Sequence, residues 1–319
     1  MTNKKRGDRI LAYKKRTNLP HIKDERQKRR IKMKKLFASV ASALLLVTGA
    51  LGLTACGKEE VKYPVEDGKF TVVTNCPFGM YEYIGDDGKI YGIDIELAGL
   101  FAQENNLELV VKNIDFDAIF TQVDSGYADA GMAGITVTED RQKVYDFSDT
   151  YCKASQKLIV KSDNNDFDGM TDATAVENVL KALSGKKIGY QTGTTGGMYI
   201  NGDEAFGFDG FSNIEGKGYD TAVLAVEDML NGNLYAVVVD EGPANAIVAM
   251  NNNSDKIKVI DVKLTDEEYA FVMKKGNKTL QDKFNEFIAK VKADGTYDEI
   301  EAKYYQNVGT KVGYKVTTD

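Results

Sequence analysis

From Phe70 onward, short apolar strands alternate with amphipathic helices, and this alternation constrains the fold more than any other feature of the sequence. In the helical segments, apolar residues recur every three or four positions. Such alternation predicts an α/β fold with parallel sheets that are covered by helices on both faces. The predicted strands are 70–75, 107–114, 128–136, 186–191, 234–240, 256–262 and 270–274. The predicted helices are 94–105, 116–125, 221–230, 242–251, 279–293 and 296–305. Because the chain has 319 residues, we expect two lobes rather than a single core.

The first 55 residues have the pattern of an export signal. Lys and Arg outnumber Asp and Glu by 15 to 3 there, and an apolar run, 36–53, ends in Leu53-Thr-Ala-Cys56. Basic, apolar and small residues in that order predict a secretory signal peptide. A cysteine directly after Leu-Thr-Ala resembles the bacterial lipobox, in which Cys56 would be acylated, with palmitate among its acyl chains, and would become the new N-terminus. An uncleaved membrane anchor is the alternative, because about 18 apolar residues can just span a bilayer.

The start of the chain allows two interpretations. Residues 1–32 are very basic, and taken alone they could be a nucleic-acid-binding arm. Met33 opens an ordinary signal peptide, so the natural start is either Met33 or Met1 with a long basic extension. The predicted fold therefore omits residues 1–55.

Composition excludes several functions for the rest of the chain. Residues 56–319 hold 45 Asp and Glu against 26 Lys and Arg, which argues against nucleic acid or an anionic membrane as the partner of this part. The only histidine, His21, precedes the predicted cleavage site, so the mature chain would lack histidine-based catalysis and histidine metal sites. The stretch 164–169 has a weak calcium-loop pattern, but Ala175 stands where a bidentate Glu is needed.

One predicted strand end combines several groups that suit an anion. The strand 128–136 leads into a helix start at Thr138, whose side chain can cap the helix. The two acidic residues that follow suit the helix dipole, whereas Arg141 opposes it. Such a break of a local rule is expected where function outweighs stability. Thr136 and Arg141 would face the same crevice, where a hydroxyl, backbone amides and a guanidinium form a carboxylate receptor. A solvated surface arginine is the alternative.

The motif Ala133-Gly-Ile-Thr-Val-Thr-Glu-Asp-Arg141, followed by Tyr145-Asp-Phe-Ser-Asp-Thr-Tyr151, closely resembles the signature of the family-3 extracellular solute-binding proteins, the amino-acid receptors of ABC importers. The resemblance covers nearly all of the chain after residue 60. It implies a periplasmic-binding-protein-like fold of two α/β lobes joined by two crossover strands, with the ligand in the interlobe cleft at the carboxyl ends of the strands. It places lobe one at 60–151 and 270–319, lobe two at 156–265, and the crossovers at 151–155 and 265–270.

The same resemblance implies roles for individual residues. Arg141 would pair with the ligand α-carboxylate, and Thr136 would contact both the carboxylate and the amine. Gly134 would offer its carbonyl oxygen to the ammonium group, which Asp240 would bind from lobe two. A buried anion at a strand end is costly unless a cation arrives, which favours this role for Asp240 over that of a helix N-cap, although both are compatible. The residues that would complete the carboxylate shell are Thr194 and Thr195. The aromatic walls would be Phe78 and Phe116, for which core packing is the alternative.

Specificity depends on two neutral amides. Asn75 stands where several relatives carry an acidic residue, and Gln191 lies at another position that contacts the ligand side chain. Neutral amides suit a polar, uncharged ligand, so the expected order is glutamine or another polar amino acid, then cystine, then basic ones. The segment 199–218 departs from the family pattern, so the identity of the amino acid stays open. Cys76 and Cys152 are permitted to pair outside the cell, and the sequence does not decide whether they do.

The implied function is a non-catalytic, monomeric receptor without cofactor or metal. It would be lipid-anchored through Cys56 to the outer face of the bacterial cytoplasmic membrane and would present an extracellular amino acid to ABC permease subunits. A secreted enzyme on the same fold, of the cyclohexadienyl dehydratase type, is an alternative. It is disfavoured because the one suggestive acid pair, Asp240 and Glu241, would point to opposite faces of a strand. A sensory lobe that reports to a membrane partner is a third possibility, which the sequence does not separate from transport.

Overall fold

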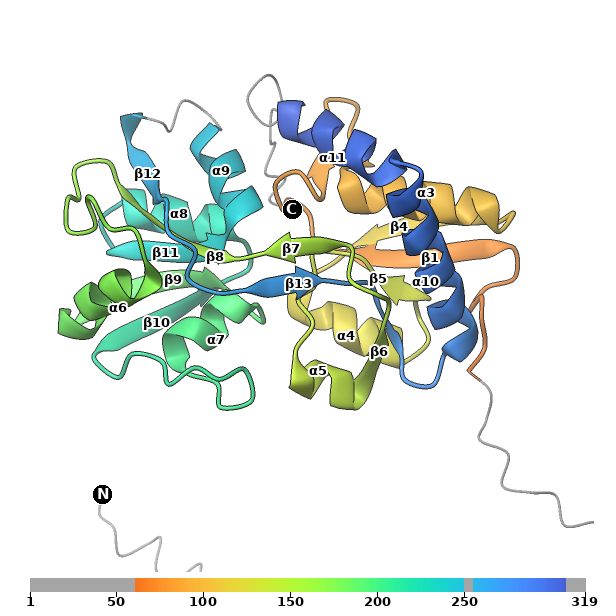
Figure 1. The fold of residues 1–319 in the computed structure, drawn as a ribbon, viewed down its shortest axis with the longest axis horizontal. Coiled ribbons are helices and arrows are strands. Elements are labelled where there is room, and N and C mark those ends of the chain that lie inside the picture. Colours follow the sequence, from red (N-terminus) through yellow and green to blue (C-terminus); the bar gives the residue numbers. More distant parts are fainter. Residues whose placement is uncertain (1–60, 250–254, 308–319) are drawn as a thin grey trace, which may run out of the picture. The chain divides into compact units, whose positions relative to one another are not determined.

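The computed structural model describes residues 61–249 and 255–307, and these contain two large sheets (Figure 1). The predictions for residues 1–55 and for Cys56 lie outside the described residues. Within the described ranges, no helix is long and apolar enough to cross a membrane.

Lobe one is built around a five-stranded sheet with the order β4-β1-β5-β14-β6. Its strands are β1 (Lys69–Thr74), β4 (Glu108–Asn113), β5 (Ala130–Gly131), β6 (Tyr145–Phe147) and β14 (Val272–Lys274). A separate hairpin consists of β2 (Tyr83–Ile84) and β3 (Ile90–Tyr91). Strand β1 is parallel to β4 and β5, whereas β14 is antiparallel to β5 and β6. The C-terminal part of the chain thus completes a sheet that the N-terminal part begins.

Helices pack on both faces of this sheet. They are α3 (Ile93–Glu104), α4 (Phe116–Asp124), α5 (Glu139–Val144), α10 (Lys278–Ala293) and α11 (Thr296–Asn307). On one face, Phe70 of β1 packs with Phe101 of α3 and Phe284 of α10, and the last two rings lie 4.4 Å apart. On the other face, Ile119 of α4 packs against Val272 of β14. The strand ends between these layers are therefore fixed by two hydrophobic clusters.

Lobe two has a second five-stranded sheet with the order β10-β9-β11-β8-β12. Its strands are β8 (Gln156–Lys161), β9 (Lys186–Gln191), β10 (Ile214–Tyr219), β11 (Ala236–Asp240) and β12 (Ile257–Ile260). Its helices are α6 (Ala173–Ala182), α7 (Thr195–Asn201), α8 (Ala222–Leu230) and α9 (Glu241–Ala249). Side chains of Asp172 and Thr221 cap α6 and α8. Strand β9 leads into the turn that carries Thr194 and Thr195, and β11 ends at Asp240 immediately before α9.

Two short strands run between the large sheets: β7 (Cys152–Ala154) and β13 (Glu267–Tyr269) (Figure 1). They are antiparallel, with Glu267 opposite Ala154 and Tyr269 opposite Cys152. Along β13, Glu267 and Tyr269 are buried and Glu268 is exposed. The alternation that is normal for a strand thus turns one acid inward and leaves its neighbour in solvent.

The structure corrects two predictions about the sheets. They are mixed rather than parallel, because β8, β12 and β14 each pair antiparallel with a neighbour. The predicted strand 128–136 is reduced to β5, because Gly134 adopts φ +54° and turns the chain out of the sheet. The predicted helices and the other predicted strands lie within two residues of the observed bounds, whereas β2, β3, β6, β8, β10, α6 and α7 were not predicted.

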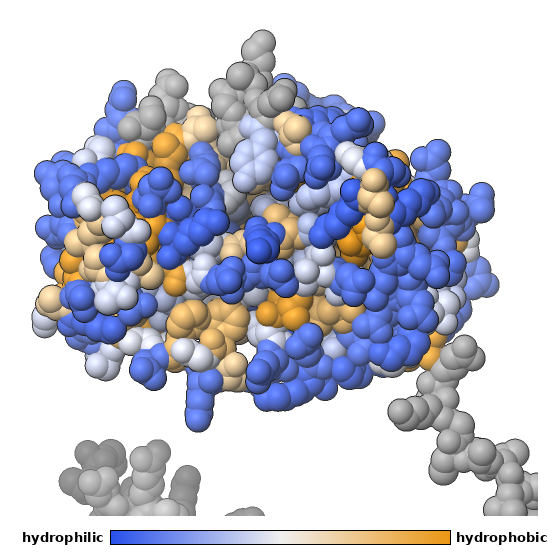
Figure 2. Space-filling model, viewed as in Figure 1, coloured by the Kyte–Doolittle hydropathy of each residue, from blue (hydrophilic) through white to orange (hydrophobic). Residues whose placement is uncertain are grey.

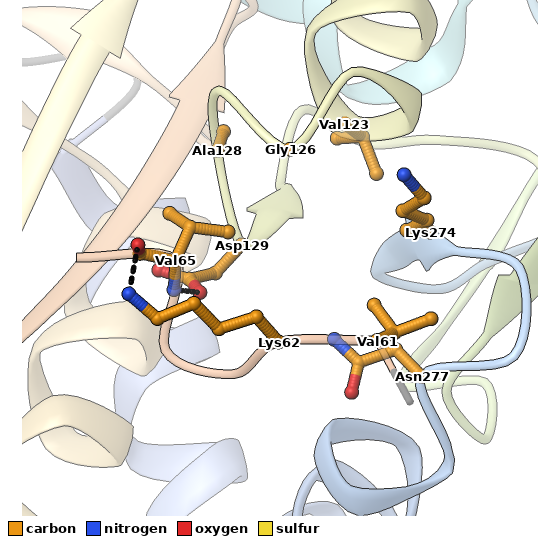
Figure 3. A pocket seen from close by; sticks show the side chains of 9 residues that line it. All are labelled: Val61, Lys62, Val65, Val123, Gly126, Ala128, Asp129, Lys274 and Asn277. Atoms are coloured by element: carbon orange, nitrogen blue, oxygen red, sulfur yellow. Dashed lines mark hydrogen bonds between the residues drawn. The ribbon is translucent and has the colours of Figure 1, made fainter. Parts of the chain in front are cut away.

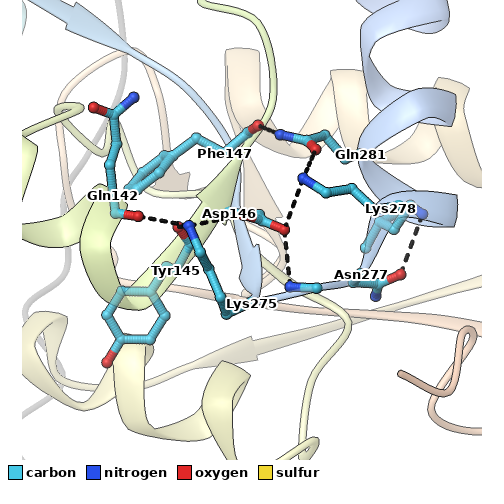
Figure 4. Close-up of polar contacts among 10 residues, drawn as sticks. Gln142, Tyr145, Asp146, Phe147, Lys275, Asn277, Lys278 and Gln281 are labelled. Carbon is cyan, nitrogen blue, oxygen red and sulfur yellow. Dashed lines mark hydrogen bonds and ion pairs between the residues drawn. The ribbon is translucent and has the colours of Figure 1, made fainter. Parts of the chain in front are cut away.

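A polar cluster fastens β6 to the start of α10 (Figure 4). The Asp146 carboxylate accepts the backbone N–H of Gly276 at 2.9 Å and pairs with Lys275 at 3.0 Å and Lys278 at 3.3 Å. Burial alone would raise the pKa of Asp146, but the N–H and the two ammonium groups hold it below its ordinary value. Asp146 therefore connects the motif segment to the start of α10 in the same lobe.

One cavity of lobe one lies away from the predicted site. Figure 2 shows a mostly hydrophilic face on which hydrophobic residues gather in small areas. A cavity of about 350 Å³ lies in lobe one, where Lys62, Val65 and Asp129 meet Lys274 and Asn277 (Figure 3). None of the predicted ligand-binding residues lines it. Beside this cavity, the Asp129 carboxylate accepts the backbone N–H of Val65 at 2.7 Å.

Candidate ligand-binding site

The loop after β5 is hydrogen-bonded to α3 at Gly134. Its N–H donates to Asp94 Oδ2 of α3 at 2.9 Å, and Asp94 Oδ1 accepts the hydroxyl of Tyr151 at 2.7 Å. A Cβ at position 134 would lie 2.6 Å from the ring of Phe78, and the φ of +54° also favours glycine. The predicted wall residue Phe78 thus packs directly on the predicted ammonium-binding residue Gly134.

Arg141 is nearly enclosed, with 8% of its surface exposed. Its Nη1 donates to the carbonyl of Thr136 at 2.6 Å, and its Nη2 donates to the carbonyl of Gly193 in lobe two at 2.9 Å. The guanidinium carbon lies 4.8 Å from the centroid of the Phe120 ring and 5.8 Å from that of Phe116. Burial lowers the pKa of Arg141 to about 10, so it remains a cation at neutral pH. The surface alternative for this arginine is therefore wrong.

The helix that begins after Thr138 is short, which changes the position of Arg141 within it. Thr138 is its N-cap, as predicted, and its hydroxyl accepts the N–H of Arg141 at 3.2 Å. However, α5 has six residues, so Arg141 belongs to its last turn as much as to its first. The conflict with the helix dipole that we predicted is consequently small, and the burial of Arg141 is the stronger sign of a special role.

In lobe two, the turn after β9 presents Thr194 and Thr195. Thr194 is the N-cap residue of α7, and its hydroxyl donates to the carbonyl of Gln191 at 2.7 Å. Thr195 is 2% exposed, and its hydroxyl accepts from Gln156 Nε2 at 3.1 Å. Of the two threonines, Thr195 is therefore the buried one, and its side chain contacts Gln156 of β8.

Asp240 ends β11 and is 4% exposed. Its Oδ1 accepts the hydroxyl of Tyr269 from β13 at 2.5 Å. Burial, followed by the negative charge of Glu267, raises the pKa of Asp240 to about 7. Tyr269 also forms an isolated β-bridge with Thr136. Asp240 and Arg141 are therefore attached to the two partners of one bridge.

The two amides predicted to read the ligand side chain contact each other. Gln191 Nε2 donates to Asn75 Oδ1 at 2.6 Å, and Asn75 Nδ2 donates to the carbonyl of Ile114 at 2.7 Å. Gln191 Oε1 is buried without a partner in the described part of the chain. The pair joins lobe one to lobe two. The predicted wall residue Phe116 is 6% exposed and also belongs to the core around Ile119.

Sequence reasoning missed Glu267 and Gln156. Glu267 is 3% exposed and accepts from the hydroxyls of Thr136 and Thr195, at 2.7 and 2.8 Å. The alternating pattern of β13 indicates that one of its two adjacent glutamates points inward, but a single sequence does not show which one. Gln156 gave no signal because its strand, β8, was not predicted.

The assembled site has charges of both signs and no metal-binding cluster. Arg141 supplies a cation, Asp240 and Glu267 supply acidic side chains, and the hydroxyls of Thr136 and Thr195 donate to Glu267. Within the described residues, no group of His, Cys, Asp and Glu side chains is arranged to hold a metal ion. Cys76 and Cys152 are both free thiols, which answers the open question of their pairing for this structure. The geometry suits a small zwitterion, with a carboxylate at the arginine and an ammonium group at the acids.

Comparison with known proteins places this chain among amino-acid-binding relatives. The model for bacterial extracellular solute-binding proteins, family 3, matches residues 70–307. The chain is 28% identical over 275 residues to a probable histidine-binding protein of Neisseria gonorrhoeae, a match that covers 84% of this chain and 96% of that protein.

Solved structures agree with this match. The amino acid ABC transporter substrate-binding protein AbpA from Streptococcus pneumoniae, bound to L-arginine, is similar with a TM-score of 0.66 and 30% identity, over 76% of this chain and 97% of that one. The ancestral amino-acid-binding protein AncCDT-1, a precursor of cyclohexadienyl dehydratase, is similar with a TM-score of 0.64 and 27% identity, over 75% and 96% of the two chains. Because the family model spans well over half of its length, this chain belongs to the family-3 bacterial extracellular solute-binding proteins.

Proposed function

We propose that this chain is an extracellular receptor that binds a free amino acid and delivers it to the permease of an ABC importer. One observation carries the proposal. A buried guanidinium from lobe one and a buried carboxylate from lobe two are attached to the two partners of the Thr136–Tyr269 bridge. Two opposite charges held apart by the protein complement the carboxylate and ammonium groups that every free amino acid carries.

The contacts of Asn75 and Gln191 favour a polar side chain on the ligand. Gln191 Oε1 is buried and unpartnered among the described residues, so it can accept a hydrogen bond from a ligand amide, hydroxyl or imidazole group. No acid occupies position 75, which makes the site less suited to arginine or lysine than one with a carboxylate there. In the 199–218 segment, the negative charge of Asp203 favours the charged form of Arg141. We therefore place glutamine and other polar amino acids first, then cystine, then basic ones.

We further propose a lipid anchor at Cys56 and action as a monomer. Both follow from the lipobox-like Leu-Thr-Ala-Cys56 sequence and from the family resemblance. Transport and sensing use the same ligand-binding chemistry, so amino-acid uptake in a deletion strain separates these two roles.

Thermal unfolding of residues 58–319 with each standard amino acid, cystine and ornithine tests the proposal. The protein is first unfolded and refolded to remove any ligand that was bound during purification. A ligand present at 100 times its dissociation constant adds about 2.7 kcal/mol to the free energy of unfolding, which gives a clear rise in Tm.

The pattern of shifts decides between the candidate functions. A strong shift with one or a few amino acids supports the receptor and names its ligand. If demonstrably empty protein shows no shift with any of them, the receptor proposal fails. Turnover of a cyclohexadienyl substrate by the same preparation would then favour the enzyme alternative, which the likeness to AncCDT-1 keeps in view.

A further inference from the structure

Thr136, Gln156, Thr195, Asp240, Glu267 and Tyr269 form a polar cluster between the lobes. Glu267 lies at its centre although it belongs to neither lobe. It is the first residue of β13, and its Oε2 accepts the hydroxyl of Thr136 from lobe one at 2.7 Å and that of Thr195 from lobe two at 2.8 Å. Its Oε1 accepts the hydroxyl of Thr265 at 2.6 Å. One carboxylate therefore accepts hydrogen bonds from three hydroxyl groups at the point where the lobes and the crossover strand meet.

Glu267 forms no direct ion pair within the described part of the chain, although its negative charge acts on the buried Arg141 guanidinium. Among the described residues, no lysine or arginine nitrogen forms an ion pair with this side chain. A carboxylate that is 3% exposed and is held only by neutral hydroxyls is costly to bury. Asp240, which is 4% exposed, is the next acid in the same cluster, and its side chain also has a neutral partner, Tyr269. Two buried acids with neutral partners form a site that gains stability when a cation enters it.

Each threonine hydroxyl has a single proton, and the contact with Glu267 decides where that proton points. An ionised carboxylate only accepts hydrogen bonds, so Thr136 and Thr195 must each donate their single hydroxyl proton to Glu267. Thr195 also accepts from Gln156 Nε2, which leaves it one lone pair, and Thr136 keeps both of its own. Neither hydroxyl can then donate to a ligand carboxylate, but both can accept from a ligand N–H.

We propose that Glu267 is a positioning residue of the amino-acid site, which turns the hydroxyl lone pairs of Thr136 and Thr195 toward the ligand ammonium group. The inference rests on the proposed function and makes it more specific. The ammonium group is received by Asp240 and by two hydroxyl oxygens, one from each lobe. The ligand carboxylate is then left to Arg141 and to backbone amides. This assignment differs from the one that the family resemblance gave, in which both threonines also serve the carboxylate.

Three variants separate the contributions of Glu267. Glu267→Met removes the charge and both acceptor oxygens, so the two hydroxyl protons become free to turn toward the ligand. Glu267→Gln removes the charge but keeps one oxygen that can accept from both threonines. Glu268→Gln, at the neighbouring exposed position on β13, is the matched control. Dissociation constants are measured by calorimetry for L-glutamine and L-arginine and, by competition, for their analogues without the α-amino group, 4-carbamoylbutanoate and 5-guanidinopentanoate.

We expect Glu267→Met to weaken binding of the amino acids by about 10- to 100-fold, the loss typical of hydrogen bonds to a charged group. Glu267→Gln should restore part of that loss, and Glu268→Gln should bind as the unmodified protein does. The analogues, which have no ammonium group, should lose less than about 3-fold in Glu267→Met. Equal losses for amino acids and analogues would show a merely structural bridge and overturn the inference.

A double-mutant cycle with Thr136→Val gives a second criterion. If Glu267 acts through the Thr136 hydroxyl, the effect of Glu267→Met on amino-acid affinity shrinks in the Thr136→Val background. Independent, additive effects of the two changes contradict the inference while the receptor function stands. If the unmodified protein binds no amino acid at all, the proposed function fails, and this inference fails with it.

Discussion

At the scale of single residues, Arg141 shows how one side chain can be committed before any ligand arrives. It is the only arginine after residue 30. Two of its N–H groups are used on backbone carbonyls, one from each lobe, and aromatic rings lie 4.8 and 5.8 Å from its guanidinium carbon. A guanidinium has five N–H donors in a fixed fork, so donors remain for a ligand carboxylate.

Arg141→Ala is expected to weaken amino-acid binding by two to four decades. The change leaves a ligand carboxylate buried without its cation, which costs about 3–5 kcal/mol. Arg141→Lys should also bind poorly, because a single ammonium group cannot replace the fork. Calorimetric titration with the amino acid that gives the largest thermal shift measures both. Lys143→Ala, on the same helix but paired at the surface with Asp140, is the control. Near-normal affinity in Arg141→Ala would remove the centre of the proposed function.

Gly134 gives a second prediction at this scale. Gly134→Ala places a Cβ 2.6 Å from the Phe78 ring and keeps φ at +54°, so we expect a loss of about 1–3 kcal/mol in the free energy of unfolding. Gly126→Ala is the matched control, because position 126 also has a positive φ, +73°, but a Cβ there would have no other atom within 4 Å. Denaturant unfolding of both variants compares them. Equal losses would mean that the contact with Phe78 has no energetic consequence.

At the scale of elements, helices and strands with a clear local pattern were predicted well, whereas strands whose place depends on long-range pairing were not. Helices α3, α4 and α10 were predicted within one residue because their apolar spacing is local. Strand β8 pairs antiparallel with β11 and β12, and β10 is an edge strand with two glycines, so neither follows from alternation alone. The length of β5 depended on the single turn at Gly134.

The candidate site shows the same division. Motif positions such as Arg141 and Asp240 were predicted from the residues around them and from the family resemblance. Glu267 was missed because its role depends on two hydroxyls that lie 131 and 72 residues away in the sequence. No local pattern encodes a contact of that range, since it is created only when both lobes meet the crossover strand.

The contacts of Asp146 give a prediction for how β6 and the start of α10 are held together. Asp146→Ala leaves the Gly276 N–H and two lysines without their acceptor, so we expect a loss of about 1–3 kcal/mol in stability. Because the folded pKa of Asp146 is depressed, its contribution is present at neutral pH and is lost as pH falls through that pKa. Chemical unfolding at pH 7 measures the loss, with Asp140→Ala, an exposed ion-pair partner, as the control. Identical stabilities of the two variants would contradict the fastening role.

At the scale of the whole molecule, the buried acids couple folding, proton binding and ligand binding. Burial raises the pKa of Asp240 from 3.8 to about 7 and that of Asp94 from 3.8 to about 6. Between the ordinary and the folded pKa, the native protein holds a proton that the unfolded chain has released. Stability of the ligand-free protein therefore falls as pH rises through this window.

Ligand binding should have the opposite dependence on pH. The ammonium group of an amino acid prefers the ionised form of Asp240, so affinity is expected to rise from pH 5 until Asp240 has lost its proton near pH 7, and then to level off. Stability of the empty protein should fall over the same range, by up to about 1.4 kcal/mol per pH unit from this one group. Titration calorimetry and thermal unfolding at matched pH values measure the two slopes.

Asp240→Asn identifies the group that is responsible. In this variant the affinity should be low and nearly independent of pH, because the titrating carboxylate is gone. The slope of stability should shrink but not vanish, since Asp94 still titrates with a raised pKa in lobe one. An affinity that keeps its full pH dependence in Asp240→Asn would assign the coupling to another group. A site that binds a cation through buried acids must show this exchange of a proton for a ligand, because the same desolvation that raises the pKa of Asp240 is relieved by the arriving ammonium group.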